Sequence, residues 1–117
     1  NYLRLLEDAR MDWLGDNLIT YSELERSGVI IPCVSASGEF LNYLRYDDPF
    51  KVVMRLTGFK GVKMSFAYEI INTDTNELCY KGVSSHFFAK DGSYKPYLSF
   101  RKEFPELYQK MNELVEA

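Results

Sequence analysis

The sequence predicts an α+β fold in which an antiparallel sheet covers one long and largely buried helix. Three observations lead to this prediction. The chain opens with apolar residues at helical spacing over residues 2–14, changes after Gly28 to runs of β-branched and aromatic residues, and returns to helical spacing over residues 101–116. The runs between the two helical segments are separated by short turns, which join antiparallel neighbours.

The first predicted helix is apolar over more than half of its circumference. Its apolar positions are Tyr2, Leu3, Leu5, Leu6, Ala9, Met11, Trp13 and Leu14, and its polar stripe consists of Arg4, Asp8 and Asp12. Such a helix is expected to be buried. Residues 15–17 are expected to end it. A short second helix is predicted over residues 21–27, with Ser22 as a candidate N-cap and Gly28 as its terminator.

Five strands are predicted between the second helix and the last one. They cover roughly residues 29–35, 40–46, 50–59, 62–72 and 77–89. Alternation is clearest over residues 62–72, where one face is formed by Val62, Met64, Phe66, Tyr68 and Ile70. Pro32 favours a strand start or an edge, and Pro105 fits only the first turn of a helix. No repeat or linker divides the chain, so we expect one domain.

Composition and charge bound the class of protein. The chain has 117 residues, of which 46% are hydrophobic and 15% aromatic, as expected for one folded domain. Its net charge is −3 and its basic residues are scattered, which argues against nucleic acid as a partner. Cys33 and Cys79 lack the spacing of a metal or redox pair and are expected to be free, buried thiols in a reducing, cytoplasmic setting. No stretch is apolar enough to predict a membrane span.

Two side chains are candidates for chemistry, since the common nucleophile, zinc and phosphate motifs are absent from the sequence. His86, the single histidine, lies in the last predicted strand and is either a hydrogen-bonded structural residue or a base. Glu7 lies off the polar stripe of the first helix. It either forms an ion pair with Arg10 or faces a substrate pocket as a base, a nucleophile or a hydrogen-bond acceptor.

Two charged pairs in predicted turns have a structural interpretation as well as a functional one. Asp47 and Asp48 precede Pro49 and are expected to serve the turn rather than to act as paired carboxylates. Lys60 and Lys63 bracket the predicted turn at Gly61 and are either solvated or in contact with phosphates of a ligand.

Taken together, several motifs resemble those of the 4-hydroxybenzoyl-CoA thioesterase branch of the hotdog superfamily. They are Asn1-Tyr2-Leu3-Arg4, Glu7-Asp8-Ala9-Arg10 and Trp13-Leu14 on the helix, Arg45-Tyr46-Asp47-Asp48-Pro49 in a turn, and Gly82-Val83-Ser84-Ser85-His86-Phe87-Phe88 on the last strand. The resemblance implies a hotdog fold, in which a five- or six-stranded antiparallel sheet wraps round a long central helix. It implies homodimers or homotetramers with active sites at the dimer interface. It also implies hydrolysis of an acyl-CoA or acyl-carrier-protein thioester without a metal or organic cofactor.

The resemblance also suggests roles for individual residues. Glu7 matches an acidic helix position near the acyl group, and Asn1 and Tyr2 belong to the helix-entry motif expected to contact substrate. Lys60, with Lys63 across the turn, matches a basic position that contacts the nucleotide phosphates of CoA. Ser84 and His86 match a strand that faces the site. The main catalytic aspartate and the helix N–H that polarises the carbonyl are expected upstream of Asn1, so residues 1–117 are expected to be a single hotdog domain without its N-terminal strand and catalytic loop.

Two other functions fit the same features. One is a non-catalytic hotdog module that binds acyl-CoA or assembles through its sheet. The other is a hotdog dehydratase, which needs a catalytic histidine paired with an acid or amide on the helix side. His86 fits that role poorly, because it lies on a late strand.

Overall fold

The computed structural model describes residues 2–116, with side chains from Arg4 onward. Its elements, in chain order, are α1 (Tyr2–Asn17), α2 (Tyr21–Arg26), β1 (Val29–Ile30), β2 (Cys33–Phe40), β3 (Phe50–Lys60), β4 (Lys63–Asn72), β5 (Glu77–Phe87), β6 (Ala89–Lys90), α3 (Phe100–Glu103) and α4 (Pro105–Leu114). None of the helices in this described part of the chain is long and apolar enough to cross a membrane.

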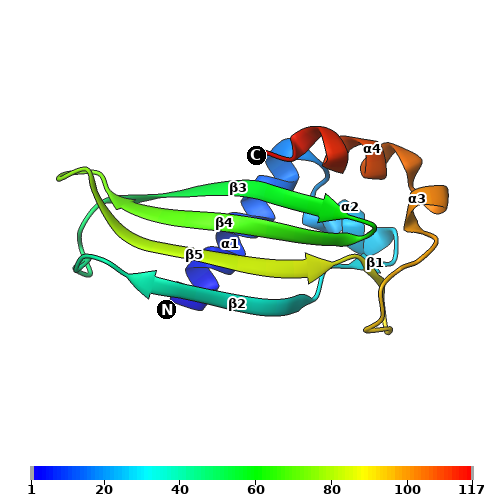
Figure 1. The fold of residues 1–117 in the computed structure, drawn as a ribbon, viewed down its shortest axis with the longest axis horizontal. Helices are drawn as coiled ribbons and strands as arrows, with labels where there is room; N and C mark the ends of the chain where they lie inside the picture. The colour runs from blue at the N-terminus through cyan, green and yellow to red at the C-terminus, as the bar shows by residue number, and fades with distance from the viewer. Residues whose placement is uncertain (1, 117) are drawn as a thin grey trace.

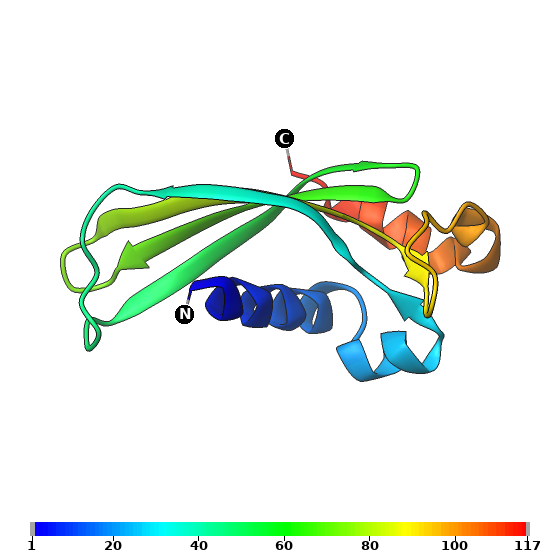
Figure 2. The ribbon, with the colours of Figure 1, turned by 90° about the horizontal axis from the view of Figure 1, so that it is seen from below.

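The fold is a twisted antiparallel sheet that covers one long helix. Strands β2, β5, β4 and β3 form a four-stranded sheet in that order, and β1 pairs with β6 in a separate two-stranded sheet (Figure 1). Helix α1 lies against one face of the larger sheet, which curves over it (Figure 2). The predicted α+β arrangement of an antiparallel sheet wrapped round a long helix is therefore confirmed.

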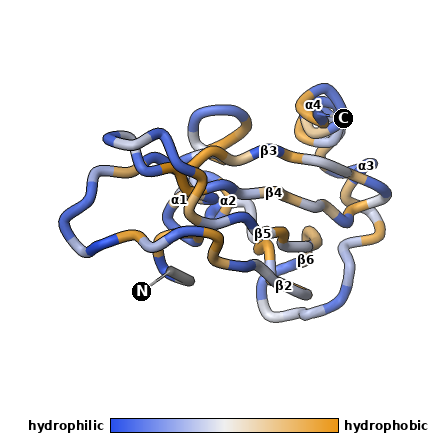
Figure 3. Tube along the Cα trace, turned by 60° about the vertical axis from the view of Figure 1, so that its left-hand side comes forward, coloured by the Kyte–Doolittle hydropathy of each residue, from blue (hydrophilic) through white to orange (hydrophobic). Residues whose placement is uncertain are grey.

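The core lies between α1 and the sheet face that it covers. Alternate residues of β4 point into it and are at most 2% exposed, namely Met64, Phe66, Tyr68 and Ile70. Leu6 and Leu14 of α1 pack in the same cluster, and the Trp13 ring meets the Phe66 ring edge-on at 5.3 Å between centroids. Both hydrophobic and hydrophilic residues occur along α4 (Figure 3), as expected for a helix with one buried face.

The region between α2 and β3 differs from the prediction. The strand predicted over residues 29–35 is interrupted at Ile31 and Pro32, because proline cannot donate to a ladder of backbone hydrogen bonds. The strand predicted over residues 40–46 is wrong: β2 ends at Phe40, and the chain then forms an irregular, largely exposed segment up to β3. Half of the residues of β2 are polar or glycine, namely Ser35, Ser37, Gly38 and Glu39, so its sequence does not predict a strand.

Two helix boundaries also differ from the prediction. Helix α1 continues through residues 15–17 instead of ending before them. The N-cap of α2 is Thr20 rather than Ser22, since its Oγ1 accepts a hydrogen bond from the Glu23 backbone N–H at 3.3 Å. The Thr20 hydroxyl also donates to the Glu23 carboxylate at 2.8 Å.

The helix predicted over residues 101–116 is divided into α3 and α4. Phe104 lies between them with φ −129° and ψ 61°, outside the helical region, and Pro105 occupies the first turn of α4. This is the position at which the missing proline N–H costs nothing. The closing helix thus begins as predicted from Pro105, with a separate short helix before it. Met111 of α4 is fully buried.

Candidate functional site

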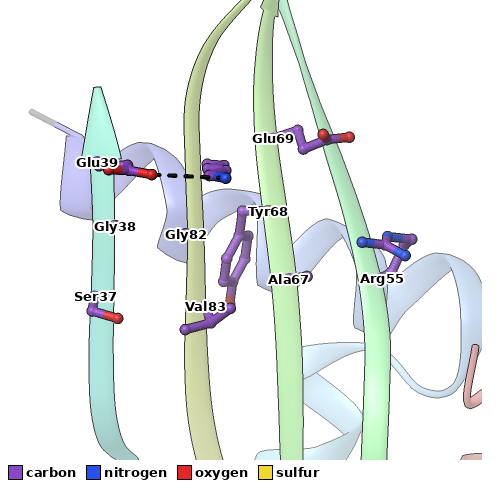
Figure 4. Close-up of a pocket in the computed structure, with 10 residues that line it drawn as sticks. Ser37, Gly38, Glu39, Arg55, Ala67, Tyr68, Glu69, Gly82 and Val83 are labelled. Atoms are coloured by element: carbon purple, nitrogen blue, oxygen red, sulfur yellow. Dashed lines mark ion pairs between the residues drawn. The ribbon is translucent and has the colours of Figure 1, made fainter. Parts of the chain in front are cut away.

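One hollow lies on the face of the sheet turned away from α1. It has a volume of about 550 Å³ and is bordered by Ser37, Gly38, Glu39, Arg55, Ala67, Tyr68, Glu69, Lys81, Gly82 and Val83 (Figure 4). The Lys81 ammonium and the Glu39 carboxylate form an ion pair there at 3.7 Å, with both side chains more than half exposed. Ion pairs in such exposed positions contribute little binding energy. Apart from Tyr68, whose hydroxyl is already bonded to Arg10 and Ser84, none of the residues that border this surface is a buried polar or charged residue.

A second cavity, of about 370 Å³, lies between α1 and the strands it covers. Its walls come from α1, α2, the β1–β2 link, β4, β5 and the segment after β6, and consist of Glu7, Arg10, Met11, Leu14, Tyr21, Ile30, Ile31, Pro32, Cys33, Phe66, His86 and Tyr94. A largely apolar cavity with a few convergent polar groups is typical of a site for a small organic ligand. We therefore take this cavity as the candidate site.

A chain of hydrogen bonds runs behind the cavity wall. The Arg10 guanidinium donates to the Tyr68 hydroxyl at 3.1 Å, that hydroxyl lies 2.6 Å from Ser84 Oγ, and Ser84 Oγ lies 2.8 Å from His86 Nε2. Tyr68 and His86 are each 2% exposed and Ser84 is 4% exposed. The strand register accounts for the assembly, because Phe66 pairs with Ser84 and Met64 pairs with His86, which places these side chains on the helix-facing side of the sheet.

Burial shifts the protonation of two members of this chain. Desolvation lowers the pKa of His86 to about 4, and the positive charge of Arg10 acts in the same direction. The imidazole is therefore neutral at pH 7. Desolvation also raises the pKa of the Tyr68 hydroxyl, and the hydrogen bonds that join this hydroxyl to Ser84 and Arg10 oppose the rise. His86 Nδ1 is buried, and the backbone of Ile31 and Pro32, which hydrogen-bonds to the ring, opposes the lowering of the pKa of His86.

Glu7 borders the same cavity from α1. Its side chain is exposed, so its carboxylate lies where the cavity opens to solvent. Within residues 2–116 no ion pair joins it to Arg10, whose guanidinium is instead directed at Tyr68. In this structure Glu7 therefore borders the candidate cavity and is not paired with Arg10.

The predicted lysines and the two N-terminal residues are not among the described residues that border the cavity. Lys60 and Lys63 form the last pair of the β3–β4 hairpin and are exposed. Lys63 alternates with the buried Met64, so it points to the sheet face opposite the cavity. Asn1 and the side chain of Tyr2 lie outside the described residues. Cys79 is buried and free as predicted, whereas Cys33 is free but exposed, because it begins the edge strand β2.

The structure adds two residues that sequence reasoning had not assigned to the site. Arg10 was considered only as a partner for Glu7, and Tyr68 only as a core residue. Alternation along β4 does place Tyr68 on the buried face, but its contact with Ser84 depends on the β4–β5 register, which no sequence signal specified. In the described chain no cluster of three or more His, Cys, Asp or Glu side chains could hold a metal ion.

Comparison with known proteins agrees with this architecture. The family described as "Thioesterase-like superfamily" matches residues 1–109. The protein named "Putative acyl-CoA thioesterase YneP" from Bacillus subtilis (strain 168) is 33% identical over 106 residues, which are 91% of this chain and 75% of that protein.

Two solved structures show the same fold. A DHNA-CoA thioesterase from Staphylococcus aureus superposes with a TM-score of 0.87 at 23% identity, over 97% of this chain and 74% of that one. A hypothetical protein from Aquifex aeolicus superposes with a TM-score of 0.77 at 27% identity, over 92% of this chain and 82% of that one. These likenesses confirm the hotdog fold expected from the sequence.

Proposed function

The chain belongs to the thioesterase-like superfamily, and on this premise we propose that it hydrolyses an acyl-CoA or acyl-carrier-protein thioester to a free acid and a thiol. The observation that carries the proposal is the match over residues 1–109, supported by 33% identity to a relative named as an acyl-CoA thioesterase. The cavity supports it as well, because its apolar walls suit an acyl group and its opening carries a carboxylate.

Glu7 is the residue we propose to take part in the reaction. Hydrolysis requires a water oxygen to attack the thioester carbonyl carbon, after which the carbon–sulfur bond breaks and the thiolate takes up a proton. A carboxylate at the cavity opening can accept the proton of that water, or can attack the carbonyl itself. Glu7 is the acidic side chain among the residues that border the cavity.

The test is thiol release from a panel of acyl-CoA thioesters, followed with a thiol-reactive chromophore. We expect turnover by the wild-type protein and a fall in kcat of roughly 100-fold or more in Glu7→Gln, the scale of loss on removing a general base. Asp8→Asn is the matched control, because Asp8 is the adjacent carboxylate of α1 and borders other surface hollows instead of this cavity. Equal turnover by both variants would remove Glu7 from the mechanism.

The alternative is a non-catalytic module that binds acyl-CoA. The same cavity could hold an acyl group without cleaving it. Saturable binding of acyl-CoA with no thiol release over the whole panel would favour this alternative. Dehydration of a 3-hydroxyacyl-CoA, detected by the absorbance of the conjugated thioester, would instead favour the hotdog dehydratase.

Lys60 and Lys63 are proposed contacts for the nucleotide phosphates of CoA. Their exposure at the end of a hairpin leaves both ammonium groups accessible to a large anionic ligand. In Lys60→Glu we expect a higher KM for acyl-CoA and an unchanged KM for the matching acyl-pantetheine, which lacks the nucleotide. An equal effect on both substrates would refute the phosphate contact.

We also propose that the protein forms homodimers or homotetramers in the cytoplasm. All residues of β2 are exposed, although β2 is an edge strand of the sheet and edge strands are ordinarily protected or paired. Large exposed apolar side chains lie on β2 and just after it, at Val34, Leu41 and Tyr43. The free thiols of Cys33 and Cys79 support a reducing location. The mass in solution at micromolar concentration tests the assembly: we expect at least two chains, and fewer in Val34→Lys.

A further inference from the structure

Arg10 is a half-buried cation on the wall of the candidate cavity. Its guanidinium donates to the Tyr68 hydroxyl at 3.1 Å and lies over the Tyr68 ring, 5.9 Å from the centroid. A guanidinium has several N–H donors, so this contact uses only part of its hydrogen-bonding capacity. Within the described residues no carboxylate forms an ion pair with Arg10, and the Tyr68 hydroxyl is its only hydrogen-bond acceptor. Arg10 therefore retains both an uncompensated positive charge and unused donors.

The rest of the cavity wall does not neutralise this charge. Burial keeps His86 and Tyr68 neutral at pH 7, because it lowers the pKa of the imidazole to about 4 and raises the pKa of the phenol. Glu7 is the acidic residue at the cavity, but its side chain is exposed and its charge is screened by solvent. The other side chains that border the cavity are aliphatic, aromatic or a thiol. The wall away from the opening thus carries one positive charge and no anion to match it.

We propose that Arg10 binds a carboxylate at the far end of the acyl group, so that the preferred substrates are ω-carboxyacyl thioesters, the CoA monoesters of dicarboxylic acids. This inference rests on the proposed thioesterase function. A planar guanidinium with free N–H groups matches a carboxylate in shape and charge, and the hydrogen bonds between the two are among the stronger ones in proteins. Pairing would also remove the cost of holding a half-buried charge without a counter-ion.

The positions of Glu7 and Arg10 on α1 set the order of groups along the substrate. The two residues are three positions apart, so they lie on the same side of the helix, with Arg10 about 4.5 Å further along the axis. Glu7 is exposed at the opening, whereas Arg10 is half-buried. The thioester carbonyl therefore lies beside Glu7, and the carboxylate lies further in. The cavity volume of about 370 Å³ equals that of roughly a dozen water-sized groups, which accommodates an acyl chain of about four to eight carbons with its oxygens.

The kinetic test compares substrates of matched shape. Each dicarboxylic acyl-CoA of the series from succinyl-CoA to suberoyl-CoA is paired with the thioester in which an isopropyl group replaces the terminal carboxylate, so that adipoyl-CoA is paired with 6-methylheptanoyl-CoA. Both members carry the same CoA, and contacts to its phosphates cancel in the ratio. After subtraction of the uncatalysed rate, we expect kcat/KM for at least one carboxylate to exceed that for its isostere by roughly tenfold to a hundredfold, the range for hydrogen bonds to charged groups. A ratio of one or less at every chain length would overturn the proposal.

Arg4 provides a matched control for Arg10, because it is an exposed arginine of α1 that borders a different surface hollow. We expect Arg10→Met to bring the substrate ratio to one or below, since methionine offers a carboxylate neither charge nor donor, and Arg4→Met to leave the ratio unchanged. Tyr68→Phe removes the hydroxyl that accepts from Arg10 but keeps the guanidinium, so the preference should persist. If Arg10 only held Tyr68 in place, Arg10→Met would lower both rates and keep their ratio, and that result would refute the proposal.

Binding without turnover separates this inference from the proposed function. Isothermal titration calorimetry of the wild-type protein compares the thioethers that correspond to the substrate pairs, such as S-(5-carboxypentyl)-CoA and S-(6-methylheptyl)-CoA, which cannot be hydrolysed. We expect the carboxylate to bind roughly tenfold tighter or more at the preferred length, the lower end of the range for a hydrogen bond to a charged group. Equal affinities throughout the series would refute the role of Arg10. If no acyl-CoA is hydrolysed but the carboxylate still binds more tightly, hydrolysis is wrong and the carboxylate site stands.

Discussion

The buried imidazole of His86 makes the stability of the protein depend on pH. Its pKa is about 4 in the folded protein, compared with 6.5 for an unperturbed histidine. Between these values the unfolded chain binds more protons than the folded one, so the free energy of unfolding falls as pH decreases below about 6.5. The loss is complete near pH 4 and above pH 6.5 the histidine contributes no further change.

The size of this effect follows from the two pKa values. One pKa unit corresponds to about 1.4 kcal/mol, so the difference between 6.5 and about 4 amounts to between about 3 and 4 kcal/mol in total. At pH 5, three fifths of the way from pH 6.5 to pH 4, the loss is about 2 kcal/mol. His86 is the single histidine in the chain, so no other imidazole titrates in this range.

The assay is urea unfolding of the wild-type protein and of His86→Phe at pH 7.5 and pH 5.0. Carboxylates contribute equally to both proteins, so the difference between their pH dependences isolates the histidine. We expect the free energy of unfolding to fall between these pH values by about 2 kcal/mol more in the wild-type protein. Equal m-values would show that both proteins unfold from comparable states. Identical pH dependences would refute the assignment of His86 as a buried, neutral group.

Three further substitutions test the packing. Gly38→Ala should destabilise the protein by about 1–3 kcal/mol in urea unfolding, because a Cβ there would overlap the ring and hydroxyl of Tyr80. Gly58→Ala is the control and should cost under about 1 kcal/mol, because the space around its Cβ is open. Equal costs for the two variants would contradict the overlap. Leu56→Ala should lower the free energy of unfolding by about 2–5 kcal/mol, since Leu56 is fully buried, and a loss below about 1 kcal/mol would show that the site collapses. Thr20→Ala should cost about 1 kcal/mol through loss of the α2 N-cap, measured in the same way, and no change would mean that another group caps the helix.

The elements that could be predicted are those with one buried face. Strand β4 follows the expected alternation because Met64, Phe66 and Ile70 are buried in the core while their neighbours face outward. The long first helix was predictable from the helical spacing of its apolar residues. It is less buried than expected, because among its described side chains only Leu6 and Leu14 are buried, whereas Met11 and Trp13 are half-buried. Pro105 could also be placed correctly, because its missing N–H restricts it to a first turn.

Strand β2 could not be predicted from its own sequence. Every one of its residues is exposed, so neither face carries the hydrophobic alternation by which strands are recognised. It exists because its backbone pairs with β5, from Cys33 opposite His86 to Phe40 opposite Tyr80. Backbone pairing of this kind depends on a neighbour about 50 residues away and leaves little trace in local composition.

The candidate site divides in the same way. The sequence by itself determined that Glu7 departs from the polar stripe of its helix and that His86 lies within a strand, because both statements depend only on local periodicity. Only the tertiary structure decided that Arg10 is directed at Tyr68 and that Ser84 links Tyr68 to His86. Those contacts require a particular register between β4 and β5 and a particular packing of α1 on the sheet. The segments involved are distant in sequence, so only the folded geometry brings their hydrogen-bonding groups together.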